Sequence, residues 1–520
     1  MSNIAGIDLG TTFSALAILN AIGKPEIVPN ADGERLTPSA IFFDEEDPDV
    51  IRVGIEALNS RYLNVERSVR WIKRYMGDKK YCVKIDGKKW TPVELAALIL
   101  KKLKQDCSPL LRQGRGEIRD AVISVPAHFD EVRRKATMDA GTAAGLNVIG
   151  LVNEPVAAAL YYATTREVSG KVLVYDLGGG TFDVTILDIN GRQMDIICSQ
   201  GDHALGGIDF DRKILEMLQQ KYRDKFTAEL INSDEERAKY EDEAEDIKKT
   251  LSRRAAAKKM LYGPAGCVKV EITRPMFEQA ISPLMARIDI LIEVALEEAK
   301  VKPSGIDKVL LVGGSARIPL VQQRLEKMFG FPADMTVNVD ECVALGAALH
   351  AGLTMLREKP DEVPVGIASG LQDIRLTDVC NHSYGTICAP VDKETGRRVV
   401  ANRIILKKNT PLPCESSQRF YTMSQGQTEL EVTITQGEDT DVDYVNKIAT
   451  HRFKLPPNRA AECPIKVTYS YDVNQRMHCR FQDIESGRVL EVDFSLDQNG
   501  QMLQSDVKER KEKLKKVKVQ

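Results

Sequence analysis

A short segment that occurs twice constrains the fold of this chain more than any other feature of its sequence. Asp8-Leu9-Gly10-Thr11-Thr12 follows the apolar run 4–7, and a second segment at 176–181, with the sequence DLGGGT, follows the apolar run 172–175. Each copy precedes another strand-like run. Glycines that follow an apolar run are typical of a strand entering a tight turn. The repetition therefore predicts a duplicated subdomain whose two strand–turn–strand units face each other.

The wider pattern places these units in an α/β domain. Up to residue 357, short apolar runs alternate with helical patterns such as Phe210, Ile214 and Leu218, which share one face at 3.6 residues per turn. Strands that alternate with helices favour the α/β class. After residue 380 the period changes to two, as at Leu430 and Val432, which predicts a half-buried antiparallel β region.

These patterns divide the 520 residues into four parts. We expect an α/β domain at 1–357, a linker at 358–379, a β domain at 380–498 and a charged tail at 499–520. The tail segment 506–520 contains seven basic and three acidic residues. We expect it to be frayed or solvated rather than a single short helix.

The composition argues against several classes of protein. With 72 basic and 75 acidic residues, the net charge of −3 gives no reason to expect a nucleic acid or a membrane surface as a partner. No run approaches the roughly 20 apolar residues of a spanning helix, and the N-terminus lacks the basic start of an export signal. The ten cysteines are scattered without a CxxC pair, which predicts reduced thiols rather than disulfides or zinc ligands. We therefore expect a cytoplasmic protein.

The repeated turns carry the chemistry of a phosphate site. Glycine lets the backbone approach a ligand and point its N–H groups at oxygens, and threonine adds a hydroxyl donor. An aspartate at the end of the preceding strand can bind Mg²⁺ through water, because Mg²⁺ gives up its hydration shell reluctantly. The Walker pattern GxxxxGK[ST] does not occur in the chain. A single turn of this kind is more often structural, whereas two copies favour a phosphate site.

A third glycine turn follows the apolar run 309–312. The segment 313–319 has the sequence GGSARIP and precedes an amphipathic helical pattern. A strand that enters two glycines before a helix suits a nucleotide base or ribose packed against bare backbone. A tight strand–helix turn without any ligand explains the segment equally well.

These segments closely resemble the 70-kilodalton heat-shock chaperone (DnaK-like) family. Three further segments carry the resemblance, namely VPAHF at 125–129, NEPVAAA at 153–159 and GGIDFD at 206–211. The resemblance covers nearly all of 1–357, with the motifs in the family's order. It implies an actin-like, ribonuclease-H-like duplicated nucleotide-binding domain, followed by an all-β substrate-binding sandwich.

The resemblance also implies roles for individual residues. Asp8 and Asp176 match carboxylates that hold Mg²⁺ through water, and Lys73 matches the catalytic lysine, although by itself it would be interpreted as a solvated helix lysine. Glu154 matches the glutamate near the attacking water. The residues expected to be catalytic are Lys73, Glu154, Asp176, Thr181 and Asp183. Those expected to bind nucleotide are Gly10, Thr11, Thr12, Phe13, Gly178, Gly179, Gly180, Gly206, Gly207, Glu245, Lys248, Lys249, Ser252, Gly313, Gly314, Ser315, Arg317 and Asp340.

Two of the implied positions depart from the family. Lys249 stands where many relatives have arginine, which weakens the case for planar stacking over adenine, and Val339 stands where relatives usually have proline. Apart from the resemblance, the helical run 245–252 would be a solvated charged face. Pro126 and Arg134 match the proline and arginine with which relatives couple the nucleotide state to the distal domain, so the resemblance implies such coupling here.

In the β domain the resemblance is weaker and rests on KNTPLP at 408–413 and QGE at 436–438. It implies a groove for an extended peptide, with Leu430 at the central pocket, Ile387, Phe420 and Val432 in the walls and Met423 over the bound backbone. The same alternation would also fit ordinary residues of a sandwich core.

Two further departures concern the connections. The family's linker is an apolar run, which Arg375 and Thr377 interrupt here, so we expect weaker docking of that segment. Relatives continue into a long helical lid, and the 499–520 tail is too short for a full one.

The resemblance implies an ATP-dependent chaperone. ATP hydrolysis in 1–357 would change the affinity of 380–498 for unfolded or extended hydrophobic peptides, and peptide would reciprocally change the nucleotide state. The implied cofactors are ATP/ADP, Mg²⁺ and K⁺, and the implied partners also include a J-domain co-chaperone and a nucleotide-exchange factor. A nucleotide-exchange or regulatory relative that binds ATP with little hydrolysis remains an alternative, because the linker is altered. An actin-like sugar kinase or filament protein would share the phosphate turns, but the β domain argues against it.

Overall fold

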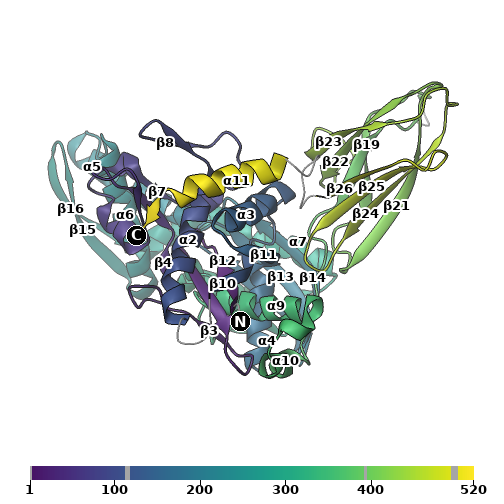
Figure 1. The fold of residues 1–520 in the computed structure, drawn as a ribbon. Helices are drawn as coiled ribbons and strands as arrows, with labels where there is room; N and C mark the ends of the chain where they lie inside the picture. Colours follow the sequence, from purple (N-terminus) through teal and green to yellow (C-terminus); the bar gives the residue numbers. More distant parts are fainter. Residues whose placement is uncertain (1–2, 112–116, 392–394, 494–501) are drawn as a thin grey trace.

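The computed structural model describes residues 3–111, 117–391, 395–493 and 502–520. Figure 1 shows a large α/β body, drawn in purple, teal and dark green, from which a β sandwich projects. Among the described helices, none combines the length and the apolar character that crossing a membrane requires.

The first repeated turn lies in a sheet with the strand order β11-β10-β1-β2-β3. Its strands are β1 (Asn3–Asp8), β2 (Phe13–Leu19), β3 (Pro25–Ile27), β10 (Ile118–Val125) and β11 (Asn147–Asn153), and the short β4 (Thr37–Pro38) pairs with β2. Strand β1 runs parallel to β10 and antiparallel to β2. The turn at 9–12 therefore joins two adjacent central strands.

The second repeated turn occupies the same place in a second sheet. The order is β17-β12-β13-β14-β18, formed by β12 (Ser169–Leu177), β13 (Phe182–Asn190), β14 (Gln193–Asp202), β17 (Lys308–Val312) and β18 (Arg375–Thr377). Strand β12 runs parallel to β17 and antiparallel to β13, as β1 does to β10 and β2. The duplication predicted from the repeated segment is therefore present in the backbone.

Two helices pack together between the halves, α4 (Glu154–Thr165) and α9 (Cys342–Glu358). Glycine permits their close approach, because a Cβ on Gly346 would lie 1.8 Å from the carbonyl oxygen of Ala157. A Cβ on Gly6 would lie 1.9 Å from the backbone nitrogen of Ala348, so α9 also lies directly on β1. This contact draws the two sheets together and places their turns opposite each other.

Outer elements extend from both halves. The first half carries α1 (Ile55–Ser60), α2 (Pro92–Leu111), α3 (Glu131–Ala143), β5 (Ala40–Phe43), β6 (Val50–Val53), β7 (Ser68–Arg70), the 3₁₀ turn η2 (Ile72–Tyr75) and the hairpin β8 (Val83–Ile85) and β9 (Lys88–Trp90). The second half carries α5 (Gly207–Phe226), α6 (Asp234–Arg253), α7 (Arg274–Ala299), α8 (Pro319–Phe329), β15 (Ala256–Gly263) and β16 (Gly266–Thr273).

The β domain consists of two four-stranded sheets that share one core. One has the order β20-β19-β22-β23 and the other β21-β24-β25-β26. Along β24 (Pro464–Tyr471), Ile465, Val467 and Tyr469 are buried and alternate with less buried residues. The remaining strands are β19 (Tyr384–Cys388), β20 (Ala401–Leu406), β21 (Cys414–Tyr421), β22 (Glu429–Gln436), β23 (Asn446–Lys454), β25 (Met477–Asp483) and β26 (Val489–Asp493).

The segment 358–379, expected to be a linker, is folded against the body. It contains α10 (Val365–Leu371) and β18, and Leu371 and Ile374 are buried in the same core cluster as α9. Strand β18 pairs in parallel with β14 at the edge of the second sheet. Arg375 does not prevent this pairing, because its exposed guanidinium turns back to donate to the carbonyl oxygens of Gln372 and Ile374.

The tail corrects an expectation, because it is not frayed but folded against the body, although most of its side chains from residue 508 onward stay exposed. Helix α11 (Met502–Lys515) lies across α2 and α3 in Figure 1, and β27 (Lys518–Val519) adds a parallel strand beside β6. Leu514 and Val517 are buried in the core of the first half, and Lys101 donates to both of their carbonyl oxygens. The two apolar side chains decide this docking despite the excess of lysines around them. The predicted boundary between β domain and tail at 498–499 lies outside the described residues.

Candidate functional site

The two repeated turns meet at a cavity of about 500 Å³ between the halves. Their contact is direct, because a Cβ on Gly179 would lie 2.2 Å from the hydroxyl oxygen of Thr12, and one on Gly180 would lie 2.6 Å from that of Thr11. Asp8 ends β1 and Asp176 lies near the end of β12, so both carboxylates reach this meeting point. The third glycine turn, after β17, forms another part of the wall.

Most of the residues predicted from the sequence line this cavity. They are Asp8, Gly10, Thr11, Thr12, Phe13, Lys73, Glu154, Asp176, Gly178, Gly179, Thr181, Glu245, Lys248, Lys249, Ser252, Gly313, Gly314, Ser315, Arg317 and Asp340. Four lie beside it without lining it, namely Gly180, Asp183, Gly206 and Gly207. Three lining residues come from segments that the sequence analysis had already noted, namely Val312, Ile318 and Val339. The sequence analysis missed three others, which are Leu36, Arg253 and Val343. Leu36 and Val343 carried no local signal apart from general core character.

Lys73 forms a buried ion pair with Glu154 inside the cavity. Lys73 belongs to η2 of the first half, and Glu154 is the first residue of α4. Both side chains are less than a tenth exposed. Burial alone would lower the pKa of Lys73, but the charges of Glu154, Asp8 and Asp176 outweigh it and raise the pKa above its usual value. Lys73 is therefore a fixed positive charge facing both phosphate turns.

The carboxylates around Lys73 suppress one another's ionisation. Burial, opposed by Lys73, raises the pKa of Glu154 to about 7. Burial and the nearby Glu154 raise the pKa of Asp183 to about 8, and burial with the neighbouring carboxylates raises the pKa of Asp176 well above its usual value. Burial also raises the pKa of Asp8 despite the charge of Lys73. A single lysine does not neutralise four acidic groups in so small a space.

This arrangement fits a divalent cation held through water. Among the described residues, no three acidic, histidine or cysteine side chains converge closely enough to enclose an ion directly. Asp8 and Asp176 nevertheless face the same cavity, and hydrated Mg²⁺ needs only one or two carboxylates together with phosphate oxygens. A cation there would lower the pKa of each surrounding carboxylate by its charge.

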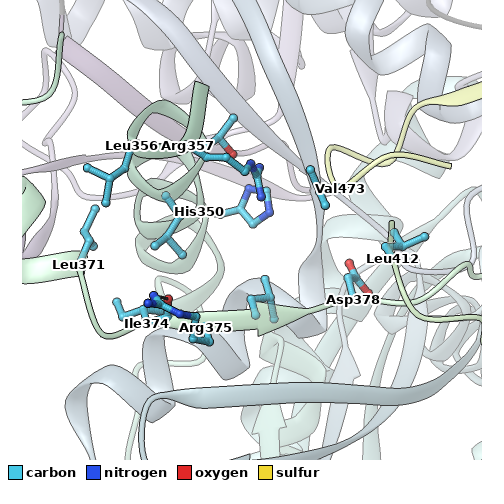
Figure 2. Close-up of a pocket in the computed structure, with 12 residues that line it drawn as sticks. His350, Leu356, Arg357, Leu371, Ile374, Arg375, Asp378, Leu412 and Val473 are labelled. Carbon is cyan, nitrogen blue, oxygen red and sulfur yellow. Dashed lines mark hydrogen bonds between the residues drawn. The ribbon is translucent and has the colours of Figure 1, made fainter. Parts of the chain in front are cut away.

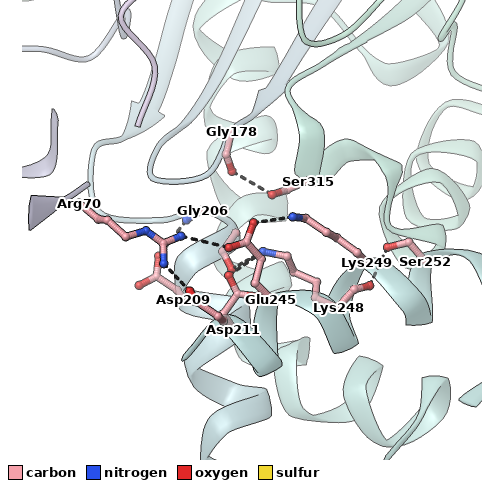
Figure 3. A network of polar contacts seen from close by, with 12 residues as sticks. Arg70, Gly178, Gly206, Asp209, Asp211, Glu245, Lys248, Lys249, Ser252 and Ser315 are labelled. Atoms are coloured by element: carbon pink, nitrogen blue, oxygen red, sulfur yellow. Dashed lines mark hydrogen bonds and ion pairs between the residues drawn. The ribbon is translucent and has the colours of Figure 1, made fainter. Parts of the chain in front are cut away.

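Helix α6 of the second half forms another wall of the cavity, and its side chains take part in a network of polar contacts (Figure 3). Lys248 donates to the carbonyl oxygen of Gly207 at 3.0 Å and pairs with Asp211 at 2.7 Å. Lys249 pairs with Glu245 at 2.8 Å. Lys248 is thus engaged with α5, whereas Lys249 is largely exposed at the entrance. The helical run 245–252 is therefore not merely a solvated face, because Lys248 is bonded to residues of α5.

Two arginines of the first half reach across the cleft to the second half. Arg70 at the end of β7 donates to Glu245 at 3.2 Å (Figure 3). Arg74 donates to both carboxylate oxygens of Asp209 and to the carbonyl oxygen of Gly180 at 3.1 Å. These contacts join residues more than 100 positions apart, so no spacing in the sequence indicates them.

The residues expected to couple the two domains lie at their junction. Arg134 is buried and donates to the amide oxygen of Asn153 at 2.5 Å. Asn153 in turn donates to Asp378 at 3.5 Å, and Asp378 also accepts a hydrogen bond from Gln475 of the β sandwich. Pro126 begins the turn that leads into α3. One chain of polar contacts thus joins α3, the end of β11, the segment 358–379 and the sandwich.

A glutamate that the sequence analysis missed is the centre of a second contact. Tyr384 and Tyr471 of the sandwich both donate to Oε1 of Glu131, at 2.6 and 2.7 Å. The backbone N–H of Glu131 donates to the side-chain oxygen of Gln436 at 3.3 Å. Glu131 is the first residue of α3, a position that is usually exposed. Its burial therefore depends on the docked sandwich.

The residues predicted to form the peptide groove differ in exposure. Val432 is buried in the sandwich core, whereas Leu430 and Phe420 pack partly buried against it. Ile387 is partly exposed, and Met423 is exposed. None of the described cavities is lined by these five residues. For Val432 the contacts are those of an ordinary core residue.

Comparisons with known proteins cover the body and the sandwich together. A family model described as Hsp70 protein matches residues 4–520. The chain is 37% identical over 496 residues to a protein named Chaperone protein DnaK from Thermotoga neapolitana, which covers 93% of this chain and 79% of that relative. Proteins of the same name from Thermotoga maritima and Thermosipho melanesiensis match with the same identity and coverage.

Proposed function

This chain belongs to the Hsp70 family, and from that membership we propose how its residues divide the work of an ATP-dependent chaperone. Members of the family are ATPases, with an actin-like nucleotide-binding domain followed by a β sandwich, and this chain has both parts. The nucleotide-binding domain corresponds to 1–357 and the peptide-binding sandwich to 380–498. The observation that carries the proposal is the buried pair of Lys73 and Glu154 between the two phosphate turns.

In the proposed site, the glycines and threonines of the two turns hold the phosphates through backbone N–H and hydroxyl donors. Lys73 offsets the charge that develops on the transferred phosphoryl group. Glu154 and Asp183 orient the attacking water, and their raised pKa values suit groups that hold or accept a proton near neutral pH. Asp8 and Asp176 would hold Mg²⁺ through water, and the bound ion would offset phosphate charge. K⁺ is proposed as a second cation.

On the other wall, α6 and the third glycine turn would hold the nucleoside. Ser315 donates to the carbonyl oxygen of Gly178 at 2.9 Å, which ties the third turn to the second phosphate turn. Arg317 pairs with Asp340 at 2.8 Å at the entrance. Lys249, exposed at the same entrance, would cover the base with a flexible stem instead of a planar guanidinium.

The sandwich is proposed to bind an extended peptide where its first sheet opens. The ladder between β19 and β22 consists of Tyr384 to Thr386 opposite Gln436 to Ile434 and ends there. Beyond it, Ile387 and Leu430 lie on strands that pair only with their other neighbours. An extended peptide can form main-chain hydrogen bonds in such a gap and place a side chain against partly buried apolar residues.

Coupling is proposed to pass through the junction of Arg134, Asn153 and Asp378. These side chains touch the body, the segment 358–379 and the sandwich at once. A J-domain co-chaperone and a nucleotide-exchange factor are proposed as partners on the ground of family membership alone. A cytoplasmic location is proposed because all ten cysteines are free thiols.

The proposal is tested by measuring ATP turnover with and without an extended hydrophobic peptide, and peptide affinity with ATP and with ADP. We expect peptide to change turnover and ATP to weaken peptide binding, because linkage is reciprocal. If the chain binds ATP but neither hydrolyses it nor responds to peptide, the proposal is wrong and a regulatory relative is the better description.

A further inference from the structure

A second cavity, of about 300 Å³, lies where α9, the segment 371–378 and the sandwich meet. Figure 2 shows side chains from all three parts arranged around it. The volume is at the lower end of the range for small-molecule sites. None of its lining residues belongs to the nucleotide cavity or to the predicted peptide groove. They are His350, Leu353, Thr354, Leu356, Arg357, Leu371, Ile374, Arg375, Leu376, Asp378, Leu412 and Val473.

The floor of this cavity contains two buried polar groups without partners. His350 and Thr354 lie one turn apart on α9, and neither Nδ1 of His350 nor Oγ1 of Thr354 has a hydrogen-bond partner in the described part of the chain. Burial lowers the pKa of His350 to about 4, so its ring is neutral at physiological pH. Buried polar atoms are nearly always satisfied, so this pair requires a group that the chain itself does not supply.

The mouth of the cavity carries two arginines without a carboxylate partner. Arg357 donates to the amide oxygen of Asn474 at 2.8 Å, and in the described part of the chain the guanidinium of Arg375 donates only to two backbone carbonyl oxygens. Within the described residues, neither guanidinium forms an ion pair. The one carboxylate in the wall, Asp378, is occupied by Gln475 and Asn153 and by the backbone N–H of Val379.

The rest of the wall is apolar. Leu353, Leu356, Leu371, Ile374, Leu376, Leu412 and Val473 make up the remaining wall. The cavity therefore combines two arginines, an apolar wall and two neutral hydrogen-bonding groups, and Arg357 follows Thr354 by one turn of α9. This combination matches an amphipathic anion rather than a sugar, a nucleotide or a metal ion.

We propose that this cavity binds a small carboxylic acid with an apolar body, whose carboxylate meets Arg357 and whose body lies among the leucines. A hydroxyl at the far end of such a molecule would meet His350 and Thr354. Charge-assisted pairing with a guanidinium supplies direction, and burial of the apolar body supplies most of the affinity.

Binding at this position would act on the contact between the domains. Leu412 and Val473 belong to the sandwich, whereas the remaining wall belongs to α9 and the segment 371–378. A ligand that touches all three binds the docked arrangement better than a separated one and shifts the population towards it. The same compound therefore stabilises docking without occupying either the nucleotide or the peptide site.

The test uses calorimetric titration of the full chain with three matched probes. They are 3-(4-hydroxyphenyl)propanoate, 3-phenylpropanoate and the neutral 3-phenylpropan-1-ol. We expect saturable binding of both acids, tighter binding of the hydroxylated acid, and at least about tenfold weaker binding of the alcohol, because it lacks the charge-assisted pair. Absence of saturable binding of either acid, or equal binding of acid and alcohol, overturns the proposal.

Two variants locate the site. Arg357→Gln removes the guanidinium and should weaken acid binding about tenfold or more, and Leu353→Phe fills the cavity without changing its charge and should abolish binding. Arg119→Gln, on an exposed arginine of β10 that lines none of the described cavities, is the matched control and should bind as the parent chain does. Undiminished binding in Leu353→Phe overturns the proposal even if Arg357→Gln disturbs the contact with Asn474. Because binding is read directly, the result is independent of ATP turnover.

Discussion

Lys73 and Glu154 form an ion pair that is buried where the two repeated turns meet. The pair joins η2 of the outer first half to the start of α4, which packs between the sheets. Glu154 keeps Lys73 charged where burial alone would neutralise it, and Lys73 in turn opposes the rise that burial causes in the pKa of Glu154. The lysine is consequently held in position before any phosphate arrives, which is the condition under which a charge stabilises a transition state without reorganisation.

Lys73→Met should separate hydrolysis from binding. We expect single-turnover ATP hydrolysis to fall by about 100-fold or more, while nucleotide affinity, measured with a fluorescent ADP analogue, changes much less, because the turns and α6 remain. Lys269→Met, on an exposed lysine of β16, is the control and should leave the rate unchanged. An equal loss of affinity and rate in Lys73→Met would show that the lysine only binds.

Arg74→Lys should loosen the closed cleft. Arg74 donates hydrogen bonds to both carboxylate oxygens of Asp209 across the cleft, and lysine cannot form that bidentate contact. We expect nucleotide dissociation, followed by stopped-flow fluorescence, to become about tenfold faster. Arg212 contacts the same Asp209 from the exposed surface of α5, so Arg212→Lys is a matched control. Equal acceleration in both variants would mean that cleft closure does not depend on Arg74.

Tyr384→Phe and Tyr471→Phe should each weaken docking of the sandwich. Each change removes a hydrogen bond to Glu131 and leaves the ring in place. Hydrogen bonds to a charged group contribute about 1.5–3 kcal/mol. Because both bonds end on one oxygen, which either hydroxyl alone can still satisfy, we expect the double variant to lose more than the sum of the single losses. Docking is measured in the presence of ATP by energy transfer between one dye on the body and one on the sandwich. Strictly additive losses in the two single variants and the double variant would argue against a shared acceptor.

Docking should also depend on pH through two histidines that face each other across the junction. The rings of His128 and His382 lie 5.1 Å apart. Burial, reinforced by Lys408, lowers the pKa of His128 to about 4, and burial with His128 lowers the pKa of His382 well below its usual value. The other charged groups around the pair are Arg133, Arg134, Asp202 and His203.

The separated state therefore binds more protons than the docked state. Docking is fully favourable above about pH 6.5, where both states are neutral, and weakens as the pH falls from about 6.5 towards about 4. Energy transfer across this range measures the effect, and His382→Leu should flatten the curve. His478→Gln, in the same sandwich, should leave it unchanged. A curve that is as steep in His382→Leu as in the parent chain would exclude this pair as its cause.

Leu514→Ala should destabilise the first half of the body. Leu514 is 1% exposed and packs in the core beside α2 and α3, and truncation of such a leucine costs about 2–5 kcal/mol. We expect a lower melting temperature in calorimetry and faster hydrogen exchange in β6, which β27 covers. Lys515→Ala, at the adjacent exposed position, should change neither. Unaltered exchange in β6 would mean that the tail is not held by this contact.

Local patterns were sufficient for the parts of the molecule that repeat or alternate. The duplicated turns at Asp8 and Asp176 predicted the two related sheets, because a strand that ends in glycines and a carboxylate has few structural interpretations. The period of two around Leu430 predicted the sandwich strands for the same reason. Lys73 and Glu154 were found only through resemblance, because a lysine on a short helix carries no signal of burial.

Other features depended on contacts between distant segments. The period of two could not distinguish Val432 in the core from Leu430 beside it, since both point to the same side of the strand. The tail looked solvated because its charges were visible in the sequence, while the surface that receives Leu514 was not. Arg74 and Glu131 likewise gained their roles from partners more than 100 residues away.

The sequence by itself determined the duplicated α/β body, the β sandwich and the residue types of a phosphate site. These follow from hydrophobic period and turn chemistry, which act within a few residues. Only the tertiary structure decided which charges are buried together, how the sandwich rests on Glu131, and that α11 returns to the first half. Burial and pairing of charges depend on what the rest of the chain places around them, and no local pattern records that.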